Sequence, residues 1–345
     1  MAQPLNADFD PAALKGFLAS RFGDASMSLG RIGGGQSNPT YFVDYGAHRM
    51  VLRKKPAGPI LRGAHAVDRE FRVLEALAPT NVPVPGPVLY HDGAELLGTP
   101  FYLMERLDGR IFHDCSLPGL SPAERRGIYF GMAEAMAKLH AVRPDEVGLG
   151  DYGRPGNYFE RQIGRWTRQL RESPSDRIPA LEAVADWLPQ HMPVDDGRLS
   201  IAHGDFRLGN LLFHPDKPQV IGILDWELST IGHPLADLGF CSMTWHSAPD
   251  EYGGILGLDH EALGIPSQRE FLDHYFAHAV PTAPLQRFHL VFSLFRFAVI
   301  FVGIADRARE GSAASADAAS TSPLARRFAV RAQEIIQGAR PWSAA

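Results

Sequence analysis

Four polar side chains lie at the ends of short apolar runs in the second half of the chain: Asp205, Asn210, Asp225 and Glu227. The runs LLF and VIGIL are typical of buried strands, and the turn HPDKPQ between them predicts a hairpin that returns Asp225 toward Asn210. An amide oxygen and a carboxylate oxygen suit Mg²⁺, and Asp205 would lie nearby in the loop, able to accept a proton. One such acid is usually a turn or cap residue, but the four together predict a site.

A glycine-rich turn, Ile32–Asn38 (IGGGQSN), separates two predicted strands. Such a turn leaves backbone N–H groups available and lets an anion approach closely. Ser37 and Asn38 would add side-chain donors for a phosphate group. The alternative is a simple hairpin turn. No GKS or GKT follows, so the turn is not a Walker loop.

A cation on a predicted strand and an acid on the next helix could form an ion pair. Arg53 and Lys54 end the strand VLRKK, and the helix predicted over 64–78 places Glu70 on an otherwise apolar face. A buried carboxylate needs a partner, and either cation would supply one. Alternatively, Glu70 lies at the rim of the helix and pairs with Arg69 or solvent.

Another acid, Asp237, lies in the stretch GHPLADL (232–238), where Pro234 suits the first turn of a helix. One interpretation is that Asp237 compensates the helix dipole. The other is that it binds the backbone of the 203–210 loop, HGDFRLGN. The sequence leaves both open.

The elements that must position these residues fall into two groups. Residues 28–106 have five strand-like segments and the helix over 64–78, preceded by a short helix over 10–22. After Gly109 the pattern is mostly helical around a β-rich insert at 199–225, and SPAE (121–124) predicts a capping box. Helices are also predicted over 156–173, 178–190, 234–246, 268–279, 284–305 and 321–338. We therefore expect a β-rich part at 1–107 and a helical part at 108–345.

The bulk composition is ordinary for a soluble protein: 345 residues, 45% hydrophobic and 21% charged. The net charge of −5 gives no reason to expect nucleic acid or a membrane as partner, and no obligate protein partner is evident. Two cysteines without a CxxC pair argue against a disulfide framework or structural zinc. The N-terminus lacks a signal-peptide pattern, and the apolar stretch around Phe292–Ala305, interrupted by Arg296, is too short for a bilayer. A cytoplasmic protein is expected.

Taken in order, these motifs resemble the aminoglycoside phosphotransferase-like branch of the protein-kinase fold. The pattern HGDxxxxN matches His203–Asn210, IDWE matches Leu224–Glu227, and G-x-P-x-x-D-L matches Gly232–Leu238. The resemblance covers about 30–305, and the three motifs together are highly specific. The segments GGGQSNPTY, VLRKKP, HAVDREFRVLEAL and GTPFYLMERLDG are most similar to the kinase-like domain found fused to acyl-CoA dehydrogenases.

The resemblance implies an α+β, two-lobe fold with ATP in the cleft and a hydroxylated small molecule as acceptor. Asp205 would be the catalytic base, with Arg207 beside it, while Asn210 and Asp225 would hold Mg²⁺ and Glu227 would assist a second metal. The strand cation would contact the ATP phosphates and pair with Glu70. Contacts to ATP are also implied for Gly33, Gly34, Gly35, Ser37 and Asn38 at the phosphates, and for Glu105 and Leu107 in the hinge 104–107.

Two departures from the family pattern bear on these roles. Arg53 stands where protein kinases have lysine, with Lys54 next to it on the other face of an ideal strand. Arg207 stands where many aminoglycoside kinases have histidine. Neither change removes the base or the metal ligands.

Basic residues favour an anionic acceptor, such as a hydroxyacyl-CoA, over a polycationic aminoglycoside. Arg207 lies beside the proposed base, and three arginines share one face of the helix over 156–173: Arg161, Arg165 and Arg168. The alternative is a solvated helix face with Glu160 and Glu172 as neighbours.

Two other classes of function are compatible with the sequence. One is a nucleotide-binding pseudokinase, although its usual sign, a missing base or metal ligand, is not found. The other is a metal-dependent hydrolase using His203, Asp205, His214 and Asp225, which leaves the glycine-rich turn unexplained. His203 is expected to pack and orient its loop instead, and His214 lies in a turn.

Overall fold

The computed structural model describes residues 7–33, 38–58, 65–154, 156–309 and 322–342. The chain divides into a smaller unit, Met1–Gly109 with Ile221–Glu227, and a larger unit, Arg110–Val220 with Leu228–Ala345. The expected boundary at 107 lies close to the first break. Segment 221–227, expected in the helical part, groups with the smaller unit, in which the N–H of Ile223 donates to the carbonyl of Pro83 (2.8 Å).

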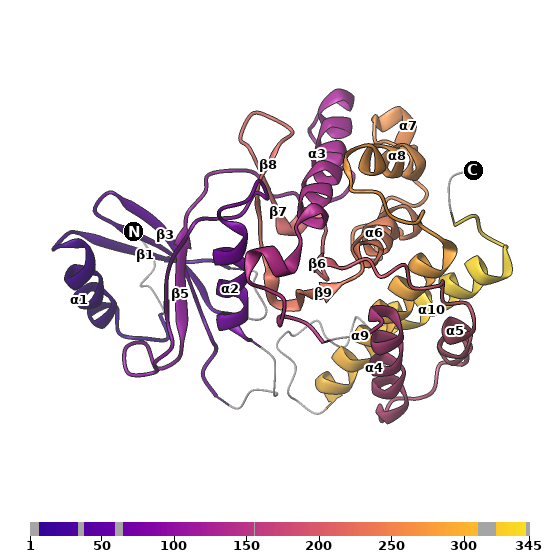
Figure 1. Cartoon of the computed structure of the whole chain (residues 1–345), viewed down its shortest axis with the longest axis horizontal. Coiled ribbons are helices and arrows are strands. Elements are labelled where there is room, and N and C mark those ends of the chain that lie inside the picture. Colours follow the sequence, from indigo (N-terminus) through magenta and orange to yellow (C-terminus); the bar gives the residue numbers. More distant parts are fainter. Residues whose placement is uncertain (1–6, 34–37, 59–64, 155, 310–321, 343–345) are drawn as a thin grey trace. The chain divides into compact units, whose positions relative to one another are not determined.

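The smaller unit is built on an antiparallel sheet with the strand order β1-β2-β3-β5-β4 (Figure 1). Two residues, Gly46 and Ala47, close the β2–β3 hairpin. The five predicted strands and two predicted helices are all present: α1 (Pro11–Phe22), β1 (Met27–Arg31), β2 (Thr40–Tyr45), β3 (His48–Lys54), α2 (Val67–Leu77), β4 (Pro87–His91) and β5 (Phe101–Glu105).

The two faces of this sheet receive different side chains because neighbours along a strand point in opposite directions. On one face Tyr41, Val43 and Leu52 pack against Leu14 and Leu18 of α1. The other face packs against α2, where Phe71 contacts Tyr102 of β5 at 5.7 Å between ring centroids. Arg53 and Lys54 are adjacent on β3, and so they must serve different faces.

The larger unit is mostly helical, as predicted, with a capping box at Ser121 and Glu124. The two units together give the predicted α+β class. The helices are α3 (Pro122–Ala141), α4 (Tyr158–Glu172), α5 (Pro179–Gln190), α6 (Pro234–Ser242), α7 (His260–Leu263), α8 (Gln268–His278), α9 (Arg287–Arg309) and α10 (Ser322–Gln337). Short 3₁₀ turns are Pro144–Val147, Leu208–Asn210, Trp226–Leu228 and Met243–His246.

Helix α9 lies at the centre of the larger unit, in contact with α4, α5, α6 and α10 (Figure 1). It has 23 residues, which is long and apolar enough to cross a membrane, so the expectation that this stretch is too short was wrong. Of its apolar window, 83% is buried inside the protein. Packing against the other helices therefore accounts for its composition.

Short strands frame the loop that carries Asp205. β6 (Ser200–Ala202) pairs antiparallel with β9 (Thr230–Gly232), and β7 (Leu211–Phe213) and β8 (Val220–Ile223) follow the loop. The predicted turn after β7 is closed by the N–H of His214, which donates to the carbonyl of Gln219 (2.8 Å). Neither β9 nor the one-turn helix α7 was predicted, since three or four residues carry too little periodicity.

Candidate active site

The loop between β6 and β7 is fixed to the larger unit by buried side chains. His203 and Phe206 have no exposed surface, and their rings meet edge to face at 5.8 Å. Gly204 has φ +83°, and a Cβ there would lie 2.7 Å from the carbonyl oxygen of Leu228, so only glycine fits. The expectation that His203 packs and orients the loop agrees with this burial.

Asp237, at the start of α6, binds the backbone of this loop. Its carboxylate, 1% exposed, accepts hydrogen bonds from the N–H groups of His203 (2.6 Å) and Gly204 (2.8 Å) and lies 3.3 Å from Nε2 of His140. Burial by itself would raise the pKa of Asp237, but these donors hold it below the ordinary aspartate value. Of the two interpretations left open by the sequence, the structure supports the backbone anchor.

The anchored loop presents Asp205 with two partners. Nδ2 of Asn210 donates to a carboxylate oxygen of Asp205 (2.7 Å) and to its backbone carbonyl (2.9 Å), while Nε of Arg207 lies 3.3 Å from the same carboxylate. The side chain of Asp205 remains 20% exposed. Both donors bind the same oxygen, Oδ2, which orients the carboxylate while it is still reachable. Because the nitrogen of Asn210 binds Asp205, the amide oxygen is the atom that can bind a metal.

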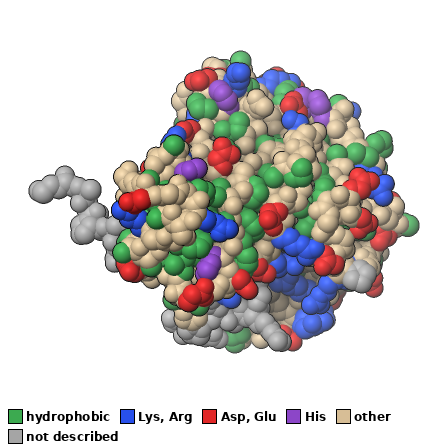
Figure 2. Space-filling model, turned by 60° about the vertical axis from the view of Figure 1, so that its left-hand side comes forward, with side chains coloured by type: hydrophobic (Ala, Val, Ile, Leu, Met, Phe, Trp, Pro, Cys, Tyr) green, Lys and Arg blue, Asp and Glu red, His purple; other side chains and the backbone are tan. Residues whose placement is uncertain are grey.

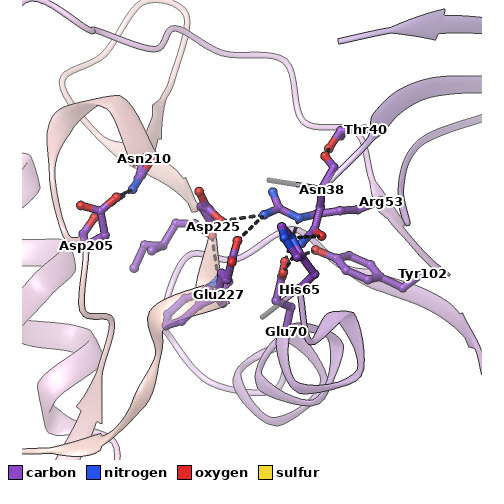
Figure 3. Close-up of polar contacts among 12 residues, drawn as sticks. Asn38, Thr40, Arg53, His65, Glu70, Tyr102, Asp205, Asn210, Asp225 and Glu227 are labelled. Atoms are coloured by element: carbon purple, nitrogen blue, oxygen red, sulfur yellow. Dashed lines mark hydrogen bonds and ion pairs between the residues drawn. The ribbon is translucent and has the colours of Figure 1, made fainter. Parts of the chain in front are cut away.

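In the smaller unit, Arg53 is the cation that pairs with Glu70 (Figure 3). Nε of Arg53 lies 2.9 Å from Oε2 of Glu70, and Nη2 lies 2.7 Å from Asp225. Lys54 serves the opposite face, where its Nζ lies 3.0 Å from Asp8. Glu70 is 1% exposed, so the alternative of an exposed rim position is wrong. Strand alternation decides between the two cations.

This cluster holds one cation for three carboxylates. Glu227 lies 4.0 Å from Arg53, so Glu70, Asp225 and Glu227 share a single guanidinium and leave two negative charges in excess. Burial raises the pKa of Glu70 to about 7, and Asp225 and Glu227 act in the same direction against Arg53. The excess charge is that of one divalent cation, and the exposed fractions of Asp225 (39%) and Glu227 (22%) leave their oxygens accessible. The donor set therefore fits Mg²⁺.

Asp225 has a backbone conformation that side chains rarely adopt, with φ +65°. The indole N–H of Trp226, a 2% exposed side chain, donates to the carbonyl of Ile223 (3.1 Å) and holds the turn. Such conformations cost free energy and are found where a side chain must be aimed. Asn210 belongs to the larger unit and Asp225 to the smaller, so their joint binding of Mg²⁺ stays a prediction.

The predicted nucleotide contacts are only partly within the described residues. Gly34, Gly35 and Ser37 lie outside them, while Gly33 and Asn38 flank the gap. Glu105 ends β5, and its N–H donates to the carbonyl of Gly86 (2.7 Å), so this N–H is already engaged. Leu107 follows β5 and is partly buried. The phosphate and adenine contacts remain predictions.

Asn38 has partners that the sequence did not indicate (Figure 3). The side chain is 3% exposed, its Nδ2 donates to Oε1 of Glu70 (2.9 Å), and Nδ1 of His65 lies 3.0 Å from its amide oxygen. The hydroxyl of Tyr102 donates to the other oxygen of Glu70 (3.0 Å). His65 and Tyr102 were both missed. The alternation of β5 could have placed Tyr102 on the face of Arg53, but nothing marked His65.

The geometry can orient a carboxylate base and hold a divalent cation, and the comparisons with known proteins agree with that chemistry. The model of the phosphotransferase enzyme family matches residues 28–282. Mouse acyl-CoA dehydrogenase family member 10 is 40% identical over 315 residues, which are 90% of this chain and 29% of that protein. Human acyl-CoA dehydrogenase family member 11 is 40% identical over 306 residues, 88% of this chain and 39% of that protein. The chain thus spans less than half the length of these relatives.

Solved structures show the same fold over nearly the whole chain. A crystal structure from Ralstonia eutropha, titled "putative aminoglycoside phosphotransferase", has a TM-score of 0.87 and 43% identity, covering 96% of this chain and 99% of that one. A spectinomycin phosphotransferase in complex with ADP and spectinomycin has a TM-score of 0.61 at 11% identity, covering 97% of this chain and 100% of that one, which supports the fold alone. The α+β fold is therefore protein-kinase-like, and the chain belongs to the phosphotransferase enzyme family.

Proposed function

We propose that this protein transfers the γ-phosphoryl group of ATP to a hydroxyl group of a small anionic acceptor, with a hydroxyacyl-CoA as the first candidate. Membership of the phosphotransferase enzyme family supports the reaction class. The names of the relatives, acyl-CoA dehydrogenase family members 10 and 11, support an acyl-CoA acceptor. The arginine beside Asp205 points to an acceptor of negative charge.

The observation that carries the proposal is the orientation of Asp205. Its carboxylate is held by Asn210 and Arg207 on a loop that Asp237 anchors, and it is still accessible. A carboxylate held in this way can accept the proton of an acceptor hydroxyl as the phosphoryl group is transferred. Phosphoryl transfer depends mainly on positioning and charge neutralisation, which rigid support of this kind supplies.

The remaining site residues are assigned to the nucleotide and metal. Arg53, positioned by Glu70, would contact the ATP phosphates, and Gly33 and Asn38 border the turn that would cover them. Asp225 and Asn210 would hold Mg²⁺, with Glu227 assisting. Bound there, Mg²⁺ would neutralise charge on the phosphates.

A screen of ATP consumption over hydroxylated compounds tests the proposal, with hydroxyacyl-CoA thioesters, simple alcohols and aminoglycosides as acceptors. We expect turnover with an anionic acceptor, and Asp205→Ala should lower kcat by about 10²–10⁴-fold because the base is lost. Asp216→Ala, in the exposed turn after β7, is the matched control and should keep the wild-type rate.

Three outcomes would contradict parts of the proposal. Full activity of Asp205→Ala would exclude its role as base. Turnover with aminoglycosides alone would overturn the anionic acceptor. Binding of ATP and Mg²⁺ without turnover of any acceptor would favour a nucleotide-binding module.

A further inference from the structure

One charged residue is buried in the apolar helix α9. Arg296 is only 9% exposed, and its guanidinium carbon lies 5.8 Å from the ring centroid of Trp166 and 5.9 Å from that of Phe240. Within the described ranges, no carboxylate lies within ion-pair distance of it. A buried charge without a counter-ion is costly, and two aromatic faces offset only part of that cost.

Arg165 lies close to Arg296, and Arg154 lies close enough to Arg165 for its charge to act on it. Arg165 on α4 has its guanidinium carbon 4.9 Å from the ring of Trp166, the same side chain that Arg296 contacts. Partial desolvation lowers the pKa of Arg165, although the residue as a whole is exposed, and the positive charges of Arg296 and Arg154 lower it further. Across the part of the chain that the structure describes, neither Arg154 nor Arg165 has a carboxylate partner.

This lack of partners bears on the two interpretations that the sequence left open for the α4 arginines. If the basic face were merely solvated, Glu160 or Glu172 would be the expected neighbours of Arg165, and neither forms an ion pair with it. On the same helix Arg171 does have a counter-ion, with Nη2 3.0 Å from Asp186. Figure 2 shows Lys and Arg side chains gathered into a patch on one face of the protein. Arg165 on α4 and Arg296 on α9 are thus two neighbouring arginines that have no carboxylate partner among the described residues.

Aromatic contacts connect this cluster to the proposed base. The guanidinium carbon of Arg207, which touches Asp205, lies 5.3 Å from the ring of Tyr252. The ring of Tyr252 is 4.7 Å from Phe297, and Phe297 is 5.6 Å from Phe240, the ring that Arg296 contacts.

These rings and Arg207 line a cavity of about 50 Å³. Sites that enclose a whole drug-sized ligand have about 300–1,000 Å³. This cavity therefore suits only a narrow apolar portion of an acceptor, and the rest would have to bind outside it.

We propose that Arg296 and Arg165, together with Arg154, form a subsite that binds a phosphate group of the acceptor. Three guanidinium groups without a counter-ion exceed the charge of a single carboxylate, whereas a phosphate or diphosphate brings two or more negative charges in a geometry that guanidinium groups match. The apolar cavity would then bind the narrow apolar portion of the acceptor that connects this phosphate group to the hydroxyl group at Asp205. This assignment rests on the proposed function, because it names the class of acceptor.

Binding of coenzyme A is the direct test, and it is compared with binding of pantetheine, which lacks both the phosphates and the adenosine of coenzyme A. Both are titrated calorimetrically with AMP-PNP and Mg²⁺ saturating the nucleotide site. We expect wild-type protein to bind coenzyme A at least tenfold more tightly than pantetheine. Arg165→Gln and Arg296→Gln should each weaken coenzyme A binding by about 10–100-fold, as for the loss of a charged hydrogen bond, without changing pantetheine binding.

Arg171→Gln is the matched control, with the same charge change on the same helix, and should stay within twofold of wild type. Arg296 is buried, so its variant is also checked by thermal unfolding; Arg165 is exposed, and its variant carries the test if Arg296→Gln misfolds. Equal affinity of wild type for both probes, or wild-type affinity of Arg165→Gln for coenzyme A, would overturn the subsite. Phosphate-dependent binding without ATP consumption by any acceptor would instead contradict the proposed function and leave the subsite in place.

Discussion

Asp237 in the larger unit and Glu70 in the smaller are both 1% exposed, and the two carboxylates are stabilised in opposite ways. Asp237 in the larger unit is surrounded by donors, two backbone N–H groups and His140, and its pKa is lowered. Glu70 in the smaller unit shares Arg53 with two further acids, and burial raises its pKa to about 7. A carboxylate whose donors are complete is an anchor. Glu70 also accepts from Asn38 and Tyr102, but it lies in a cluster whose three acids share one guanidinium.

Substitution of Asp237 should have the largest effect on stability. Asp237→Asn turns one acceptor oxygen into a donor facing a backbone N–H and removes the charge beside His140. We expect a loss of about 3–5 kcal/mol in the free energy of unfolding, as for a broken buried pair, measured by urea denaturation. Asp216→Asn, in an exposed turn, is the control. An unchanged midpoint for Asp237→Asn would show that the donors around it contribute little.

The raised pKa of Glu70 predicts a smaller effect on the free energy of unfolding, and this effect depends on pH. Its sign is opposite to that expected for a carboxylate whose pKa is lowered, such as Asp237. Between about pH 4.5 and 7 the folded state keeps a proton on Glu70 that the unfolded state has released, so this contribution to stability is present at low pH and is lost as the pH rises through 7. The shift in the pKa of Glu70 corresponds to about 3 kcal/mol in the free energy of unfolding. It is read as the difference between wild type and Glu70→Gln in urea denaturation from pH 5 to 8.

The difference in unfolding free energy between wild type and Glu70→Gln removes the contribution of other groups that titrate in both proteins. His246 and His289, whose pKa burial lowers to about 4 and about 3, act in the other direction, because their neutral folded forms lose stability as the pH falls below about 6.5. Saturating Mg²⁺ should flatten the slope due to Glu70 if the cation binds at Asp225 and Glu227. Identical pH profiles of wild type and Glu70→Gln would contradict the electrostatic account of this cluster.

The sequence predicted the helices, the strands and the acidic site residues better than it predicted the tertiary contacts that position these residues. Periodicity and capping signals are local, and they placed every long helix and all five strands of the smaller sheet within a few residues. The pairing of Glu70 with a cation on β3 also followed from helical spacing. The anchoring role of Asp237 was left undecided because it depends on bonds between residues 33 and 34 positions apart.

Two features of the site had no local signal at all. His65 reaches Asn38 from a positive-φ position, and Asp225 adopts φ +65° without a glycine to mark the turn. The burial of Arg296 was likewise hidden, since in the sequence it only interrupts an apolar run. Such features arise from tertiary packing, which residue types and spacing do not specify.

The smallest expected effect separates the two cations of β3. Arg53→Gln should raise the KM for ATP about tenfold, or about 1.4 kcal/mol, because the guanidinium that bridges Glu70 and Asp225 would no longer contact the phosphates. Lys54→Gln should leave this KM within twofold, since Lys54 pairs with Asp8 on the other face of the sheet. Steady-state kinetics with a fixed acceptor measures both. If Lys54→Gln raised the KM for ATP more than Arg53→Gln, the phosphates would depend on the cation that lies outside the Glu70 cluster. The excess negative charge around Glu70 would then not mark the face of the sheet that binds the nucleotide.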